Sequence, residues 1–206
     1  MPCCNIQLNI NDGDLIIAAD AGLNTLNKLG IKPHLIVGDF DSLDYTPEGD
    51  NVIKHPVKKN ETDTILAIDI ALEKGFKKFL IYGCIGGRLD HTYANIQTAA
   101  YVAEKGGNAV FLSDDISFTV IKDNYIEFHE DNKGIISVFA HKEAAEGVTE
   151  SGLLYELDNA TLSPDFPLGV SNEFSGNKAK ISVDNGTLCI MWETANNKYT
   201  IGGYDE

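Results

Sequence analysis

Positively charged residues are scarce in this sequence. It has 16 lysine and arginine residues against 31 aspartate and glutamate residues, which gives a formal net charge of −15 over 206 residues. Such a charge repels nucleic acids and anionic membrane surfaces, so we expect neither as a partner. A polyanionic substrate would be repelled as well, unless metal ions and a few well-placed cations reverse the sign locally.

Long apolar segments are also missing. No apolar run approaches the roughly 20 residues of a membrane span, and the amino terminus lacks the basic and apolar regions of a signal peptide. The four cysteines (Cys3, Cys4, Cys84 and Cys189) form no C-x-x-C pair and no zinc-binding spacing. Two of them, Cys84 and Cys189, fall in apolar runs where free thiols pack well. We therefore expect a cytoplasmic protein.

Three common catalytic signatures are absent: the Walker loop G-x-x-x-x-G-K-[ST], the H-E-x-x-H motif and the G-x-S-x-G elbow. What is present is an ordinary globular composition, with 43% hydrophobic and 23% charged residues. The length suits one large domain or two small ones, with a sizeable core.

The first half of the chain alternates strand-like and helix-like stretches. Strands are expected at residues 15–19, 35–37, 52–55, 79–82 and 109–112. Helices are expected at residues 23–29, 62–74 and 90–105, and each is followed closely by a glycine. This alternation predicts a parallel sheet with right-handed crossovers, that is, a Rossmann-like α/β domain.

After about Ser113 the helical periodicity stops, and short alternating runs predict an antiparallel β-sandwich. The clearest signal is Asn185-Gly186 between two apolar runs, which favours a type I′ hairpin. That hairpin would pair three sets of apolar residues on one face: Val183 with Leu188, Ile181 with Ile190, and Ala179 with Trp192. This register predicts that Trp192 packs in the core; the alternative is an exposed indole that stacks on a ligand.

Two aspartates follow the second expected strand, in Gly38-Asp39-Phe40-Asp41-Ser42. Side chains two positions apart on an extended backbone point the same way, so Asp39 and Asp41 would share a side. Converging carboxylates at the carboxyl end of a parallel strand suit Mg²⁺. The alternative is an Asx-type turn without a ligand.

Other polar clusters occur at neighbouring strand ends. Asp20 follows the first strand, and Lys58 to Asp63 precede a helix. Because the carboxyl ends of parallel strands lie along one edge, we expect these clusters to converge with Asp39. The alternatives are structural: Asp20 and Asp63 would only cap helices or complement their dipoles, and Lys58 would lie in a solvated loop.

A glycine-rich segment, Gly86-Gly87-Arg88-Leu89-Asp90-His91, joins a strand to a helix, and we expect it to converge with the same clusters. Gly86 and Gly87 allow close approach of the backbone to a ligand. Arg88 is the single arginine of the chain, and its forked cation suits phosphate oxygens. The alternatives are a surface ion pair for Arg88, a helix cap for Asp90 and a core position for His91.

These motifs, in this order, resemble the thiamine pyrophosphokinase family. The matching segments are Asp20-Ala21-Gly22, Gly38 to Ser42, Thr62-Asp63, Gly86 to His91, Ser151 to Leu157 and Gly169 to Phe174. The resemblance spans roughly residues 15 to 192 and covers motifs in both halves of the chain.

The resemblance implies an α/β catalytic domain (residues 1–125) and a β-sandwich domain for thiamine binding and dimerisation (residues 126–206), assembled as a homodimer. It implies transfer of diphosphate from ATP to the hydroxyl of thiamine, with Mg²⁺ as cofactor and AMP as the second product. The implied metal ligands are Asp39, Asp41 and Asp63, and the implied catalytic residues are Asp41, Arg88 and Asp90. The implied nucleotide-binding residues are Asp20, Gly22, Lys58, Asn60, Thr62, Gly86, Gly87 and Arg88. The implied thiamine-binding residues are Asp90, His91, Ser171 and Asn172, the last two reaching thiamine from the partner subunit.

Two positions depart from the family pattern. Ala21 stands where the family usually has glycine, and Asn60 where it often has an acid, so Asn60 brings no charge to a metal. Two other functions remain open at this point. One is diphosphate transfer to a pterin or another hydroxymethyl heterocycle, and the other is a non-catalytic nucleotide or thiamine sensor.

Overall fold

The structure is a computed structural model, and it describes residues 8, 10–54, 62–194 and 198–202. The chain splits into two compact units, Pro2–Lys77 and Lys78–Glu206. The proposed functional domains, residues 1–125 and 126–206, follow a different division and stay a prediction. Among the described residues, no helix is long and apolar enough to cross a membrane.

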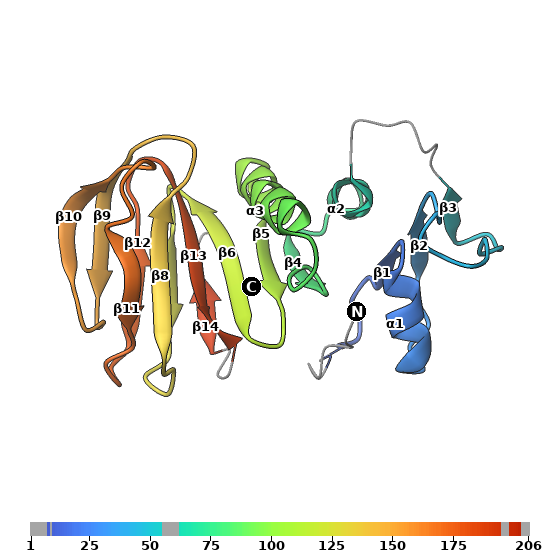
Figure 1. Ribbon diagram of the computed structural model, residues 1–206, viewed down its shortest axis with the longest axis horizontal. Coiled ribbons are helices and arrows are strands. Elements are labelled where there is room, and N and C mark those ends of the chain that lie inside the picture. Colours follow the sequence, from blue (N-terminus) through green and yellow to red (C-terminus); the bar gives the residue numbers. More distant parts are fainter. Residues whose placement is uncertain (1–7, 9, 55–61, 195–197, 203–206) are drawn as a thin grey trace. The chain divides into compact units, whose positions relative to one another are not determined.

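The first unit is a small parallel sheet with two helices (Figure 1). Its strands run in the order β1 (Ile17–Ala19), β2 (Leu35–Gly38) and β3 (Val52–Lys54). Helix α1 (Gly22–Lys28) packs on β1, and helix α2 (Asp63–Glu73) packs on β1 and β2. A core of apolar side chains holds these elements together: Ala18, Leu23, Ile36, Phe40 and Leu43.

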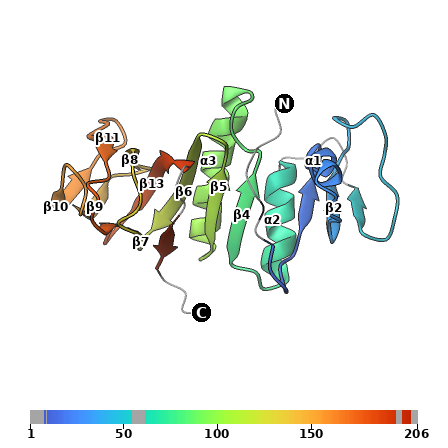
Figure 2. The ribbon, with the colours of Figure 1, turned by 90° about the horizontal axis from the view of Figure 1, so that it is seen from below.

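The second unit contains two sheets and one long helix, α3 (Leu89–Glu104). The six-stranded sheet runs β11 (Gly169–Glu173), β8 (Ile135–Ala140), β13 (Thr187–Glu193), β6 (Ile116–Lys122), β5 (Asn108–Leu112), β4 (Lys78–Tyr82). The five-stranded sheet runs β10 (Leu157–Leu162), β9 (Ala145–Ser151), β12 (Ala179–Ser182), β7 (Tyr125–Phe128), β14 (Tyr199–Ile201). Helix α3 packs on β5, β6 and β13 (Figure 2).

The expected alternation of strands and helices in the first half is confirmed, with element ends within two residues of the prediction. The parallel strands are, however, divided between two sheets. Strands β4 and β5 are parallel to each other, and β5 then pairs antiparallel with β6. The last two parallel strands, β4 and β5, therefore belong to the same six-stranded sheet as the first strand of the sandwich, β6.

The predicted hairpin around Asn185-Gly186 is wrong. Strand β12 pairs with β7 and β9, whereas β13 pairs with β6 and β8 in the other sheet. A type I′ turn needs positive φ at both central residues, and only Gly186 of this pair has it, at 125°. The N–H groups of Asp184 and Asn185 donate instead to the Glu146 carbonyl, so the segment crosses from one sheet to the other.

The apolar residues of the predicted hairpin are nevertheless buried, because the two sheets face each other. Trp192 is 2% exposed, which confirms the prediction that it packs in the core. Its ring lies edge-on to Phe128 at 5.2 Å and to Tyr199 at 5.4 Å, measured between ring centroids. The register argument for Trp192 was wrong, but Leu188, Ile190 and Trp192 still share one face of β13, because side chains two positions apart on a strand point the same way.

One acidic side chain lies in this apolar interior. Among the described residues, Glu150 of β9 is the one charged side chain that is fully buried, at 1% exposure. Its Oε2 accepts a hydrogen bond from Asn172 Nδ2 at 3.1 Å, and its Oε1 has no partner. Burial raises the pKa of Glu150 from 4.5 to about 7, since a carboxylate loses its hydration there.

We predict that protonation of Glu150 makes stability depend on pH. In the folded protein this carboxyl binds a proton more tightly than in the unfolded chain, so the free energy of unfolding falls as the pH rises from 4.5 to about 7. At about 1.4 kcal/mol for each pKa unit, the fall amounts to roughly 3 kcal/mol. Urea unfolding of wild type and Glu150→Gln at several pH values measures it, with the exposed Glu146→Gln as control. An equal pH dependence in wild type and Glu150→Gln would contradict the prediction.

Candidate functional site

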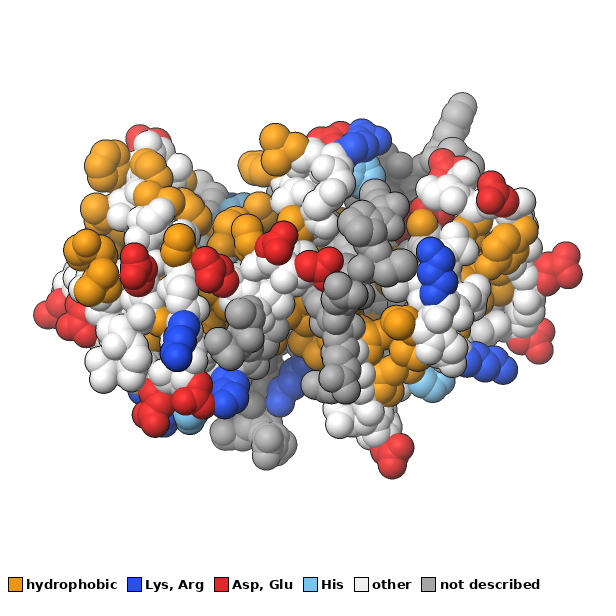
Figure 3. Space-filling model, turned by 60° about the horizontal axis from the view of Figure 1, so that its bottom comes forward, with side chains coloured by type: hydrophobic (Ala, Val, Ile, Leu, Met, Phe, Trp, Pro, Cys, Tyr) orange, Lys and Arg blue, Asp and Glu red, His pale blue; other side chains and the backbone are white. Residues whose placement is uncertain are grey.

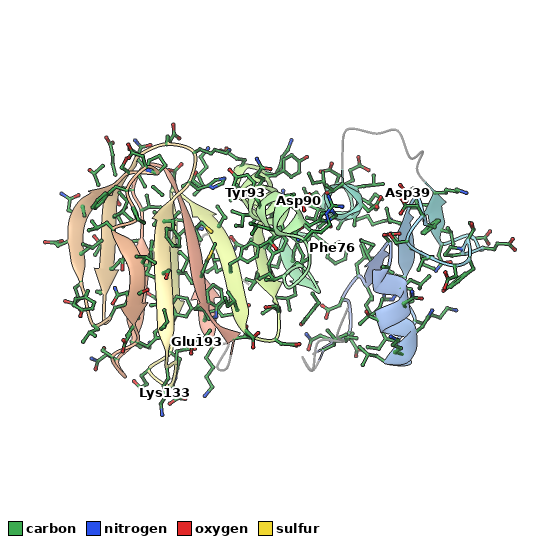
Figure 4. The ribbon with its side chains drawn as sticks, in the orientation of Figure 1. Asp39, Phe76, Asp90, Tyr93, Lys133 and Glu193 are labelled. Carbon is green, nitrogen blue, oxygen red and sulfur yellow. The ribbon has the colours of Figure 1, made fainter. Side chains whose placement is uncertain are left out.

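Two aspartates meet where β1 and β2 end. The N–H of Asp20 donates to the Val37 carbonyl at 2.8 Å, which ties the end of β1 to β2. A Cβ at Gly38 would lie 3.3 Å from the Asp20 Cα, so glycine allows the two chains to approach closely there. Asp39 follows Gly38 at the carboxyl end of β2 (Figure 4).

A third aspartate reaches the same place from helix α2. Thr62 caps this helix, since its Oγ1 accepts a hydrogen bond from the Ile65 N–H at 3.3 Å. Asp63 is the first helical residue, and α2 packs on β1 and β2. The helix therefore presents Asp63 from its amino-terminal end, where its dipole favours a negative charge.

The carboxylates of Asp20, Asp39 and Asp63 each offer an oxygen within 4.8 Å of the others. Carboxylates brought this close repel one another when they are ionised. The Asp20 Oδ1 is buried and has no hydrogen-bond partner. Crowded carboxylates with an unpartnered buried oxygen fit a hard divalent cation such as Mg²⁺, which takes oxygen ligands. The donor set therefore fits the metal expected from the sequence.

Asp41 is not a member of this cluster. Its N–H donates to Asp39 Oδ1 at 3.1 Å, and its carboxylate accepts from the Ser42 hydroxyl at 3.1 Å. The premise that Asp39 and Asp41 lie on one extended strand is wrong, because β2 ends at Gly38 and Phe40 has φ 65°. The predicted metal contact of Asp41 stays a prediction.

Three further residues of the first unit were predicted to bind the nucleotide: Gly22, Lys58 and Asn60. Gly22 begins α1, and Ala21 before it has φ −57°, a conformation that alanine adopts without strain. The departure from glycine at Ala21 therefore imposes no backbone strain here. Lys58 and Asn60 lie outside the described residues.

In the second unit, the glycine-rich segment leads from β4 to α3. Gly86 has φ 96°, and a Cβ there would meet no atom within 4 Å, so glycine serves the backbone conformation at an open position. Asn95 of α3 anchors the segment by donating from Nδ2 to the Cys84 carbonyl at 2.7 Å. Since this segment belongs to the other compact unit, its predicted convergence with the three aspartates stays a prediction.

Arg88 and Asp90 form a two-pronged ion pair on the surface. Arg88 Nε donates to Asp90 Oδ1 at 3.1 Å, and Arg88 Nη2 donates to Oδ2 at 2.5 Å. Their side chains are 73% and 62% exposed. These hydrogen bonds lower the pKa of Asp90 and raise that of Arg88. The guanidinium group of Arg88 is therefore charged, and an incoming phosphate would compete with the Asp90 carboxylate for its hydrogen bonds.

Of the structural alternatives for the start of α3, the surface ion pair of Arg88 is present, whereas the helix cap by Asp90 and the core position of His91 are wrong. Arg88, not Asp90, is the residue that precedes the helix, and Asp90 lies in the first turn (Figure 4). Its Oδ1 accepts from the His91 N–H at 3.0 Å. His91 is exposed, so it is not a core residue.

The predicted thiamine contacts of the sandwich lie on β11. Ser171 is exposed and has φ 59°, in a stretch where the register between β11 and β8 shifts. Its N–H donates to Ser137 Oγ at 3.0 Å. Asn172 is buried, and its carboxamide contacts other residues of this chain. Its role toward thiamine stays a prediction.

Two supporting residues escaped the sequence analysis. Asn95 lies on α3 four residues after His91, where nothing in the pattern distinguishes it from an ordinary helix residue. Glu150 was detectable, because Val148 and Glu150 occupy alternate positions of one strand and a glutamate at the inward position is unusual.

Comparisons with known proteins agree with this architecture. A model of the thiamin pyrophosphokinase catalytic domain matches residues 6–111, and a model of the thiamin pyrophosphokinase vitamin B1 binding domain matches residues 123–188. The thiamine pyrophosphokinase of Bacillus subtilis (strain 168) is 31% identical over an alignment of 196 residues, and the match covers 87% of this chain and 87% of that protein.

Solved structures show the same fold. The crystal structure of thiamine pyrophosphokinase from Bacillus subtilis matches with a TM-score of 0.80 and 27% identity, covering 91% of both chains. A thiamin pyrophosphokinase family protein from Enterococcus faecalis matches with a TM-score of 0.72 and 26% identity, covering 87% of this chain and 88% of that one. With matching models for both halves and a relative of this similarity, the chain belongs to the thiamin pyrophosphokinase family.

Proposed function

We propose that this enzyme, which transfers diphosphate from ATP to thiamine, holds a Mg²⁺ ion through Asp20, Asp39 and Asp63. The observation that carries the proposal is the cluster of three carboxylates, one of which, that of Asp20, has a buried Oδ1 without a partner. When bound, the ion would neutralise phosphate charge, which is what diphosphate transfer requires most. Asp41 is proposed as a further contact whose backbone already supports Asp39.

We propose that the second unit supplies the cation and the backbone donors for the phosphates. Gly86 and Gly87 would let the backbone approach the phosphate chain, and Arg88 would stabilise charge on its oxygens. The thiamine hydroxyl attacks the β-phosphorus, the bond from that phosphorus to the oxygen of the α-phosphate breaks, and AMP leaves as the hydroxyl proton is released. Thr62, Lys58 and Asn60 are kept as proposed nucleotide contacts of the first unit.

The acceptor site is proposed to use Asp90 and His91 of α3 in one subunit and the partner subunit's Ser171, on β11. Asp90 and His91 are exposed, so both are available to a ligand. Ser171 holds a left-handed backbone conformation that is uncommon for serine, and strained residues of this kind gather at ligand sites. A pterin alcohol in place of thiamine is disfavoured by the match of residues 123–188 to a vitamin B1 binding domain.

A homodimer is proposed for the assembly. The end of the second unit that carries β10 and β11 shows gathered hydrophobic side chains (Figure 3). The large hydrophobic residues at this end are roughly half exposed or more: Leu154, Tyr155, Phe166, Leu168 and Val170. Monomeric proteins rarely leave such a group uncovered. The patch adjoins Ser171, so a second copy seated there would bring its own residues beside the proposed acceptor site.

The metal proposal predicts that Asp39→Asn and Asp63→Asn weaken Mg²⁺ binding and lower turnover while the fold remains intact. Each replaces a charged ligand oxygen with a neutral one and relieves repulsion within the cluster. Calorimetric titration with Mg²⁺ in the presence of ATP measures the affinity, and AMP release measures turnover. The exposed Asp44→Asn serves as the control. If Asp41→Asn weakened binding while Asp39→Asn did not, the assignment of the three ligands would be wrong.

For Arg88, we predict that Arg88→Lys lowers the turnover number by about 10²–10³-fold, since lysine lacks the fork that matches two phosphate oxygens. Stability should change little, because the side chain is 73% exposed. Steady-state measurement of AMP release with thiamine, together with the thermal midpoint, checks both statements. Wild-type turnover in the lysine variant would remove Arg88 from the phosphate site.

The dimer proposal predicts that Leu168→Asp shifts the protein toward monomer, because a charge would be desolvated in the interface. Sedimentation equilibrium at several concentrations measures the association, and Leu29→Asp, at the exposed C-cap of α1, is the matched control. A wild-type protein that sediments as a monomer at all concentrations would refute the proposal.

A further inference from the structure

The carboxamide of Asn172 makes every hydrogen bond that it is able to make. Its Nδ2 donates to the Tyr155 carbonyl at 2.6 Å and to Glu150 Oε2 at 3.1 Å. Its Oδ1 accepts from the N–H of Tyr155 at 3.0 Å and from the N–H of Glu173 at 2.9 Å. An asparagine side chain has two donor hydrogens and two acceptor lone pairs. Direct contact with thiamine would therefore require Asn172 to give up one of these bonds.

These bonds join the two sheets of the second unit. Glu150 belongs to β9 of the five-stranded sheet, and Asn172 belongs to β11 at the edge of the six-stranded sheet. The loop after β9 continues the connection, because the Leu154 N–H donates to the Glu173 carbonyl at 2.9 Å. Strands β9, β10 and β11 lie together at one end of the unit (Figure 1; Figure 2). We call the set Glu150, Asn172 and Tyr155 the polar clamp.

The polar clamp lies next to the strained residue of β11. Ser171 directly precedes Asn172 and holds φ 59°. A serine in the left-handed region costs about 1 kcal/mol or more and persists only where its surroundings hold it. On one side the Ser171 N–H donates to Ser137 Oγ. On the other side the hydrogen bonds of the Asn172 side chain, including the one from the Glu173 N–H, hold the chain that follows Ser171. The clamp also fixes both backbone groups of Tyr155, whose side chain is 68% exposed.

Packing alone does not account for a glutamate at this position. Its neighbours across the sheet are Ile181 on β12 and Leu157 on β10. An apolar side chain would fill the same inward position without leaving the buried Oε1 unpartnered, as glutamate does. What glutamate adds is an acceptor for the second hydrogen of Asn172 Nδ2.

We propose that Glu150 is a positioning residue of the acceptor site: it holds Asn172, which in turn holds Ser171 and Tyr155 in place for the acceptor. Asn172 is then also a positioning residue, and Ser171 is the side chain that meets the ligand. This inference rests on the proposed function, since it assumes that thiamine binds beside Ser171.

The test compares Glu150→Leu, which removes the acceptor but fills the space, with Glu150→Gln, which keeps a neutral acceptor for Asn172. We expect Glu150→Leu to raise the KM for thiamine about tenfold, with the KM for ATP changed less than about twofold. Its thermal midpoint should equal or exceed that of wild type, because a buried polar group is replaced by an apolar one. Glu150→Gln should retain the wild-type KM, as should the control Glu146→Gln on the exposed side of β9.

Hydrogen exchange gives a readout that does not depend on activity. In Glu150→Leu, the amides of Tyr155 and Glu173 should exchange faster than in wild type, since both donate to Asn172. Adding Asn172→Ala to Glu150→Leu should raise the KM little beyond Asn172→Ala alone, because both changes break one connection.

Either of two results would overturn the inference: a wild-type KM for thiamine in Glu150→Leu, or unchanged exchange at Tyr155 and Glu173. Wild-type protein that forms no thiamine diphosphate would instead refute the proposed function, and the exchange measurement would still report on the clamp.

Discussion

Mutual repulsion of Asp20, Asp39 and Asp63 is the constraint around which the first unit is built. Their oxygens lie within 4.8 Å of one another, although like charges repel at such distances. Interactions of the surrounding chain hold them there: the Asp20–Val37 backbone hydrogen bond, the close approach at Gly38, the hydrogen bond from the Asp41 N–H to Asp39, and the Thr62 cap of α2. A scaffold that enforces such crowding is organised in advance for a divalent cation, whose charge offsets the repulsion.

A bound divalent cation would also offset the negative charge of the protein where the nucleotide binds. A chain with a net charge of −15 is a poor partner for a nucleotide triphosphate unless positive charge is supplied locally. The single arginine stands at the start of α3, already ionised and paired with Asp90. In the sandwich, by contrast, polar interactions fix the relative positions of strands. The buried Glu150 and Asn172 connect the two sheets by a hydrogen bond, which is directional, whereas apolar contacts are not.

Periodicity and strand-end chemistry were sufficient to predict the elements, the α/β-then-β order and the convergence of Asp20 and Asp63 with Asp39. The role of Asp63 as a metal ligand was implied by the family resemblance and stays a prediction. The failures have local causes. The pairing of Asp39 with Asp41 assumed an extended backbone, which Phe40 interrupts with a positive φ. The hairpin at Asn185-Gly186 assumed that consecutive strands pair, but contacts with Glu146 draw the segment across to the other sheet. Turn propensity describes only four residues, and tertiary hydrogen bonds outweighed it here.

Glu150 and Asn172 show a second limit of sequence reasoning. The pattern identifies Glu150 as an inward-facing position, but its partner comes from a strand 22 residues away in the other sheet. Only coordinates show that Asn172 is saturated by its own chain, which changes its expected role from ligand contact to support.

A crystal structure of the protein with Mg²⁺, a non-hydrolysable ATP analogue and thiamine tests the central claim most directly. The account predicts an ion coordinated by oxygens of Asp20, Asp39 and Asp63 at roughly 2.1 Å, together with phosphate oxygens. An ion bound to the phosphates with none of these three carboxylates among its ligands would contradict it.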